Sequence, residues 1–332
     1  MPRLVPIALC FGSVLVAETV TVYPEKYFNS FDHRHPVLRR IKPGDTVVTR
    51  TADASGRDYT GNPVASPSNP LTGPFYVEGA EPGDALLIRF DRMRLNRNWG
   101  YTGHRLGLFA LTPEYIERIY PRAYREGAAY PGRNDVLPWD LDIEKQTVKL
   151  REPTSKVMKF EFPARPMLGC VGVAAPGVFG PTSGISGNYG GNMDYNEVVE
   201  GATVWLPVFH SGGLLFVGDG HALQGDGEPT GNGIETSMNV TMTIQVKKRA
   251  NIAGPRLENA DYIVAIGSQP EFVSSLDHTQ RVATVAMIDW LVNEYKLEPW
   301  AAHQLIGFQG KLDVITVGGS MGLRIPKKVL PK

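Results

Sequence analysis

Hydrophobic and polar residues alternate along short runs through most of the chain, as expected of half-buried β-strands. The clearest run is 237–246, where apolar side chains occupy every second position from Met238 to Val246. Other strand-like runs cover 37–41, 46–49, 85–90, 146–150, 157–162, 167–175, 205–208, 214–217 and 313–317. The pattern therefore predicts a β-rich protein.

The tripeptide Pro-Gly-Asp stands between two strand-like runs twice, at 43–45 and at 82–84. Proline and glycine favour tight turns, so each copy predicts a strand, a turn and a second strand. Two such units indicate consecutive layers of a sandwich or barrel. Residues 51–74 are rich in Ser, Gly, Asn, Asp and Pro. They predict a long loop that is a candidate cover for an active site.

Late in the chain, the spacing of apolar residues changes from that of a strand to that of a helix. Apolar positions over 279–295 lie on one face of a helix, with Ser275 and Asp277 as candidate caps. A second helix is expected over 299–308. A short helix is also expected earlier, over 112–120, where Thr-Pro begins the run.

These elements predict an α+β protein that is rich in β-structure. We expect a single domain over 18–332, with a β-sandwich or barrel-like core to about residue 270 and a helical C-terminal part over 271–332.

Composition excludes several classes of partner. The 332 residues include 34 basic and 34 acidic side chains, so the formal net charge is zero. Nucleic acids and anionic membranes select strongly basic surfaces, and neither is an expected partner here. A neutral small molecule fits the composition best, and 42% hydrophobic residues are enough for a full core.

The N-terminal segment resembles a targeting signal. Arg3 precedes an apolar run over 4–17, and Glu18 follows it. This pattern predicts a secretory signal peptide over 1–17 and a secreted or periplasmic mature protein. A buried N-terminal strand is the alternative, and the protein would be cytoplasmic if the segment is not cleaved. No later run reaches the roughly 18 apolar residues of a spanning helix, so no membrane association is expected after cleavage.

Cys170 would be the one cysteine of the cleaved chain, since Cys10 lies inside the predicted signal peptide. No disulfide could then form within the chain. Cys170 lies in an apolar run without a neighbouring His, and a buried free thiol is the interpretation that fits.

Carboxylates, glycines and one histidine are concentrated between residues 190 and 235. Carboxylate and imidazole groups are ligands for divalent ions, and glycines let the backbone turn sharply around such a site. Successive β-segments would bring the side chains together at one end of a sheet. The pattern predicts a divalent metal site, with zinc as the first expectation and calcium as the alternative. The candidate residues are Asp194, Asp219, His221, Asp226, Glu228 and Glu235.

The spacing of Asp219 and His221 supports this hypothesis. Only Gly220 separates them, so both side chains would point to the same face of an extended strand. Two alternatives stay open at this point. His221 could be a core residue bonded to a structural Asp, and Asp194 could be a turn residue.

Across these motifs the chain resembles the acetamidase/formamidase family, over about residues 28–325. The central motifs lie at 165–174, 190–194, 201, 206–208, 218–222 and 225–228, and the N-terminal motifs at 69–74, 77–78 and 83–84.

The resemblance implies a β-rich fold with C-terminal helices, a divalent metal, and hydrolysis of small amides such as formamide or acetamide to a carboxylate and ammonia. Members that open cyclic amides such as γ-lactams look similar, and the family also implies a homo-oligomer. One position departs from the family pattern. Relatives often have His directly before Gly-Gly-Asn, where this chain has Tyr189.

Amide hydrolysis at neutral pH needs a strong nucleophile and a polarised carbonyl, and a bound divalent ion can supply both. We therefore assign Asp194, Asp219, His221 and Glu235 to the metal. Glu228 or Asp226 would act as general base and then as acid to the leaving amine. The rival hypothesis is an exported, metal-stabilised binding protein that has lost catalysis, and Tyr189 is the feature that favours it.

Overall fold

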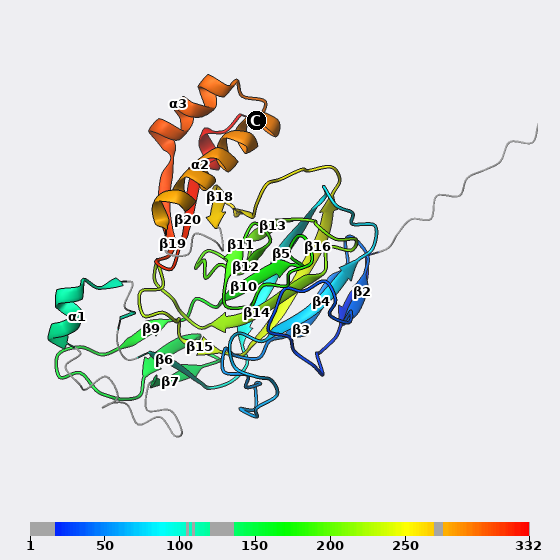
Figure 1. The fold of residues 1–332 in the computed structure, drawn as a ribbon. Coiled ribbons are helices and arrows are strands. Elements are labelled where there is room, and N and C mark those ends of the chain that lie inside the picture. The colour runs from blue at the N-terminus through cyan, green and yellow to red at the C-terminus, as the bar shows by residue number, and fades with distance from the viewer. Residues whose placement is uncertain (1–16, 104–105, 108–109, 120–135, 269–274, 332) are drawn as a thin grey trace, which may run out of the picture.

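The structure is a computed structural model that describes residues 17–103, 106–107, 110–119, 136–268 and 275–331. The predicted signal peptide falls almost entirely outside these residues and stays a prediction. Within the described part of the chain, no helix is long and apolar enough to cross a membrane. Two large, mostly antiparallel sheets make up the fold (Figure 1).

The first sheet contains the longest paired strands of the described chain. Its order is β1 (Thr19–Thr21), β3 (Thr46–Arg50), β16 (Met238–Lys247), β5 (Ala85–Leu95), β13 (Thr203–Pro207), β17 (Arg256–Glu258), β18 (Tyr262–Ser268), β20 (Ser320–Pro326) and β19 (Lys311–Thr316). In β16 the side chains alternate between buried and more exposed over most of the strand, as the sequence predicts for a half-buried strand.

The second sheet carries the segments that form the candidate site. Its order is β11 (Ser186–Gly187), β12 (Gly190–Asn192), β10 (Met167–Val173), β14 (Leu215–His221), β15 (Glu235–Thr236), β6 (Trp99–Gly103), β7 (Val136–Asp142), β8 (Thr147–Leu150) and β9 (Glu161–Pro163), while β4 (Leu71–Val77) pairs with both β14 and β2 (Arg39–Ile41). Every residue of β10 and β14 is buried.

The two Pro-Gly-Asp turns carry the chain from one sheet to the other. The first joins β2 to β3 and the second joins β4 to β5, and in each case the strands belong to different sheets. In both turns the Asp carboxylate accepts a hydrogen bond from the backbone N–H three residues earlier, at 2.7 Å for Asp45 and 2.9 Å for Asp84. The prediction of consecutive layers is confirmed.

A continuous apolar core lies between these layers. Leu86 and Phe90 of β5 belong to the same buried cluster as Val171 of β10 and Phe216 of β14. Burying a large apolar side chain contributes about 1.5–3 kcal/mol, so this core is a major source of stability. The sheets do not close into a barrel, because β1 and β19 end the first and β11 and β9 end the second.

The helices are few and mostly late, as predicted. Figure 1 shows α2 (Leu276–Asn293) and α3 (Pro299–Gln309) together at one end of the molecule, beside β18 and β20. The Ser275 side chain caps α2 by accepting the His278 N–H. The buried face of α2 includes Ala283 and Met287, whereas Val285, an expected apolar position, is exposed. The short helix α1 (Pro113–Ile119) also forms.

Two expectations about strands need correction. The strand predicted over 157–162 is reduced to β9, and Val157 is 94% exposed. The segment that forms β18 was not predicted as a strand, although all but its first residue is buried. Its apolar run is short and continuous, and a pattern without alternation does not separate a buried strand from a helix.

Candidate metal centre and active site

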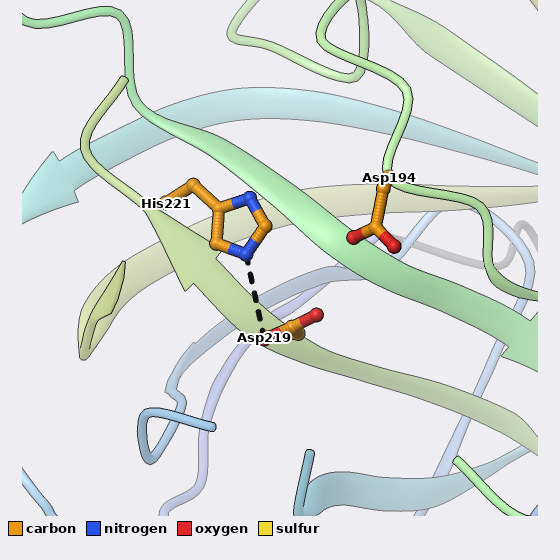
Figure 2. A group of neighbouring side chains, drawn as sticks. All are labelled: Asp194, Asp219 and His221. Carbon is orange, nitrogen blue, oxygen red and sulfur yellow. Dashed lines mark ion pairs between the residues drawn. The ribbon is translucent and has the colours of Figure 1, made fainter. Parts of the chain in front are cut away.

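The site lies where β14 ends. Asp219 and His221 lie within the last three residues of this strand, and its antiparallel pairing with β15 places His221 directly opposite Glu235. His221 Nε2 lies 3.1 Å from Glu235 Oε1 and 3.5 Å from Asp219 Oδ1. Figure 2 shows the imidazole directed at the Asp219 carboxylate, as predicted, although the left-handed backbone of Asp219, with φ of 57°, departs from an extended strand. All three side chains are buried.

Asp194 joins the cluster from the turn after β12. Its backbone is left-handed, with φ of 50°, a conformation that Asp tolerates better than most residues. The Asn192 side-chain amide donates to Asp194 Oδ2 over 2.7 Å and orients the carboxylate. In Figure 2 the Asp194 carboxylate lies beside Asp219 and His221, although it comes from a different segment.

Gly169 makes room for these carboxylates. It lies in β10 between the pairs that join Leu168 to Gly220 and Cys170 to Gly218, which places it opposite Asp219. A Cβ atom at this position would lie 2.3 Å from Asp194 Oδ1 and 2.6 Å from Asp219 Oδ2. Both distances are too short for real contacts, so the glycine in the Leu-Gly-Cys motif is a requirement of the site.

Two groups of ligand-type atoms share His221. One atom each of Asp194, Asp219 and His221 lies within 4.8 Å of the others, and the same is true of His221, Glu228 and Glu235. Glu228 is 9% exposed, with a left-handed backbone, and follows a tight Gly-Asp-Gly segment. Five of the six residues predicted from sequence are therefore brought together.

Asp226 is the one predicted residue whose side chain does not lie at the cluster. It is exposed, and its carboxylate accepts a hydrogen bond from the Asn196 side chain over 2.7 Å. Of the two residues predicted as general base, Glu228 is therefore the one that lies at the cluster.

Several buried polar atoms of the cluster have no hydrogen bond from the described residues. They are Asp194 Oδ1, Asp219 Oδ1, His221 Nε2 and Glu235 Oε2. A buried polar group without a partner costs about 1–3 kcal/mol, so four in one cluster need a common explanation. A divalent cation accepts electron pairs from imidazole nitrogen and carboxylate oxygen together. The donor set fits such an ion.

Gln224 determines which nitrogen of His221 is available. The Gln224 side-chain N–H donates to the Asp194 carbonyl over 2.6 Å, which directs its Oε1 to His221 Nδ1 at 2.7 Å. Because an amide oxygen only accepts, Nδ1 carries the proton that it receives. The lone pair of Nε2 then points toward the carboxylates, as a metal-binding histidine requires.

Burial and mutual repulsion raise the pKa values of Asp194, Glu228 and Glu235. The pKa of Asp194 is raised to about 7, first by burial and then by the Asp219 charge. Burial likewise raises the pKa of Glu235 to about 8 and that of Glu228 well above its ordinary value. Burial alone would lower the pKa of His221, but Glu235 and Asp219 raise it well above the usual range. In the absence of a cation, bound protons must therefore offset the negative charge of these carboxylates near neutral pH.

Amide side chains around the cluster form hydrogen bonds with its carboxylates. None of these amides was assigned a role from the sequence. Asn69, from the loop over 51–74, donates to Asp219 Oδ2 over 3.1 Å and to Asn192 Oδ1 over 3.2 Å. The Cys170 thiol donates to the same Asn192 oxygen over 2.9 Å. Asn69 and Asn192 both lie within the family motifs named above. Their place in these motifs was the one feature of the sequence that could have identified them as site residues.

Cys170 is buried and free, as predicted. Burial, with the charge of Asp219 next, raises the pKa of its thiol well above the ordinary value. A protonated, buried thiol is a weak nucleophile, so its role here is to donate a hydrogen bond.

Two cavities of about 290 Å³ each meet at the cluster. Both are lined by Asn192, Asp194, Glu228 and Gly231. One extends under the turn between β19 and β20, and the other is bounded by residues of the loop over 51–74. The loop therefore borders the candidate site, while its role as a cover for an active site stays a prediction.

Tyr189 lies away from both cavities. It is 2% exposed, its ring packs on Phe31 at 5.3 Å between centroids, and its hydroxyl donates to the Ile185 carbonyl over 3.2 Å. It is not among the described residues that line either cavity. The departure from the family pattern therefore alters the core beside the site and not the described cluster itself.

The chain belongs to the Acetamidase/Formamidase family, whose model matches residues 16–177 and 183–292. A formamidase of Methylophilus methylotrophus is 27% identical over 246 residues, which cover 59% of this chain and 57% of that protein. The alignment thus spans little more than half the length of this relative. The family resemblance predicted from the sequence motifs is confirmed.

Solved structures show the same architecture. An acetamidase from Yersinia enterocolitica matches with a TM-score of 0.76 at 26% identity, over 97% of this chain and 96% of that one. A gamma lactamase from Delftia acidovorans matches over 95% of this chain and 94% of that one, with a TM-score of 0.56 at 20% identity, a likeness of fold alone. The predicted β-rich fold with C-terminal helices is confirmed.

Proposed function

We propose that the protein is a metal-dependent hydrolase of small amides that releases a carboxylate and ammonia. The observation that carries the proposal is the set of four buried ligand-type atoms without hydrogen bonds, at the junction of two cavities. Family membership and the formamidase and acetamidase relatives support the same chemistry.

Asp194, Asp219, His221 and Glu235 are the residues that would hold the ion. A set of one imidazole and several carboxylates suits zinc, while calcium remains the alternative for a site so rich in oxygen. When bound, a divalent ion supplies a nucleophile by lowering the pKa of water and polarises the amide carbonyl.

Glu228 is the proposed general base and acid. It lines both cavities, so it borders the space where a substrate would lie. Burial raises its pKa well above the ordinary value, which suits a group that must take a proton from water and return it to the leaving nitrogen. Gln224 and Asn192 orient their neighbours and take no part in proton transfer.

The proposal is tested by ammonia release from formamide, acetamide and longer aliphatic amides. The protein is assayed as purified, after chelation, and after zinc or calcium is restored. We expect turnover that chelation abolishes and one of the ions restores. Turnover that persists after complete removal of metal would contradict metal dependence, and no turnover with metal bound would leave a binding protein as the alternative.

Ring opening of a γ-lactam is the second candidate reaction, and a fold shared with a gamma lactamase motivates its inclusion. It releases no ammonia, so loss of the ring amide is followed instead. Export of the mature chain and assembly into a homo-oligomer stay predictions, which fractionation of cells and light scattering would test.

A further inference from the structure

Three serine hydroxyls gather at the wall of the cavity that runs under the turn between β19 and β20. Ser268 and Ser320 face each other across the pair of β18 with β20, and their Oγ atoms lie 3.0 Å apart. Ser186 of β11 is hydrogen-bonded to Ser268 and lies 3.3 Å from Ser320. Ser268 and Ser320 are 2% and 1% exposed, so this hydroxyl group is built into the structure.

The serine group is directly connected to the candidate site. Ser186 pairs with Gly191 in β12, one residue before the Asn192 that orients Asp194. All three serines line the same cavity as Asp194 and Glu228. A molecule whose amide lies at Glu228 could therefore extend toward the serines.

The hydrogen-bonding capacity of the group favours one kind of partner. A serine hydroxyl has one donor and two acceptor positions. In a closed ring of three hydroxyls, each proton is donated within the ring and each oxygen keeps an unused acceptor position. A ligand that brings an N–H or O–H group would be bound without breaking the ring, whereas a ligand with only acceptors would have to break it.

The cavity has room for more than the smallest amides, and its described lining offers no positive charge to an anionic one. Its volume of about 290 Å³ is roughly that of ten molecules of liquid water, while formamide and acetamide are the size of a few. No Lys, Arg or His is among its described lining residues, so these residues offer an anionic group no charged partner. Ile185 and Val317 supply apolar wall beside the hydroxyls.

We propose that this cavity selects neutral amides that carry a second hydrogen-bond donor, such as a hydroxyl or another amide, on the acyl group. Ser186, Ser268 and Ser320 accept this donor and determine specificity. The proposal rests on the proposed amide hydrolysis for its substrate class, but binding can be measured separately from turnover.

Three amides of nearly equal size test the proposal. Lactamide presents a donor, pyruvamide presents an acceptor at the same carbon, and isobutyramide presents a methyl group. Binding is measured by titration calorimetry on zinc-loaded Glu228→Gln protein, which we expect to bind substrate without turnover. We expect lactamide to bind at least about threefold more tightly than either analogue, the discrimination of one neutral hydrogen bond.

Variants assign the preference to the serines. In a Ser186→Ala/Ser320→Ala double variant of the zinc-loaded Glu228→Gln protein, the ratio of the Kd for isobutyramide to the Kd for lactamide should fall at least about threefold. Because it is a ratio within one protein, it does not depend on the folded fraction. Should the double variant not fold, Ser186→Ala alone serves, since Ser186 is only half-buried.

Thr243→Val is the matched control. It also removes a hydroxyl from a network on paired strands, where Thr243 lies 2.9 Å from Thr46 Oγ1 and donates to Asp91. None of these residues lines either cavity of the site. The lactamide preference should be unchanged in this variant.

Each outcome decides one of the two proposals. Simple amides that are hydrolysed without any lactamide preference, or a preference that survives loss of the serine hydroxyls, would overturn the inference and leave the amidase intact. Preferential binding of lactamide that requires the serines would support it even if no amide were hydrolysed, and in that case only the proposed hydrolysis would fail.

Discussion

Gln224 Oε1 lies 2.7 Å from Nδ1 of His221, which leaves Nε2 of the imidazole facing the buried carboxylates of Glu235 and Asp219. The same amide reaches the Asp194 carbonyl, so one side chain ties together two segments of the site. Neither contact follows from the three-residue spacing of Gln224 and His221.

Gln224→Ala should weaken metal binding about 10- to 100-fold, the usual effect of losing the partner that orients a ligating histidine. Metal affinity measured by competition with a chelator tests this. Gln245→Ala, on an exposed position of β16, is the control and should bind metal normally. Equal affinity in both variants would contradict the role of Gln224.

His221→Ala should lose both bound metal and amide turnover, since the histidine belongs to both groups of ligand-type atoms. Metal content by mass spectrometry and ammonia release are the measurements. His303→Ala, on the exposed face of α3, should retain both. Full metal content in the His221 variant would remove this residue from the ligand set.

Glu228→Gln should keep the metal and the fold but lower kcat at least about 100-fold, the usual contribution of a general base. Asp226→Asn is the matched control, because Asp226 is exposed and bonded to Asn196. Its kcat should change little. A Glu228 variant with normal kcat would exclude this residue as the base.

Gly169→Ala should disrupt the centre, because its Cβ would lie 2.3 Å from Asp194 Oδ1. We expect about 1–3 kcal/mol of lost stability, the usual cost of overpacking, together with weaker metal binding. Gly307→Ala in α3 has no atom within 4 Å of its Cβ and should be neutral or slightly stabilising. Urea unfolding with and without metal measures both effects.

The stability of the metal-free protein should fall as the pH rises from about 4 to 8. Asp194 releases its proton at about pH 7 in the folded chain but near its ordinary value of 3.8 in the unfolded chain, so the folded chain binds more protons across this interval. Glu235, with a pKa of about 8, acts in the same direction. The raised pKa of His221 has the same sign, since its contribution is complete below its ordinary value of 6.5 and is lost as the pH rises further.

Metal should reverse this dependence, because it binds the deprotonated ligands. The increase in Tm on adding zinc should therefore grow with pH over the same interval, with affinity rising up to about tenfold per pH unit for each proton displaced. Thermal unfolding with and without zinc, at several pH values between about 5 and 8, measures it. An increase in Tm that is equal at all pH values would show that the carboxylates are not the ligands.

Elements of the fold could be predicted where the apolar residues follow a single spacing, either that of a strand or that of a helix. The alternation in β16 and the apolar face of α2 depend on local pattern, and both appear in the structure. The prediction failed at 157–160, which form no strand and where Val157 is exposed. Strand formation there depends on contacts that local sequence does not specify.

The sequence by itself determined the kinds of chemistry available. The concentration of carboxylates around His221, the glycines between them and the family motifs were sufficient to predict a cluster of ligand-type residues, and five of the six predicted residues lie together in the structure. The two-residue spacing also predicted that Asp219 and His221 lie close together, and their side chains are 3.5 Å apart. These are properties of composition and short-range geometry.

Only the tertiary structure decided which carboxylates meet. The register of β14 with β15 places Glu235 against His221, and Gly169 opens the space in which Asp194 reaches Asp219. Asp226 is close to Glu228 in sequence, yet its side chain bonds to Asn196 at the surface. The reason is that strand pairing and packing fix distances between segments far apart in the chain, and local pattern carries no record of those distances.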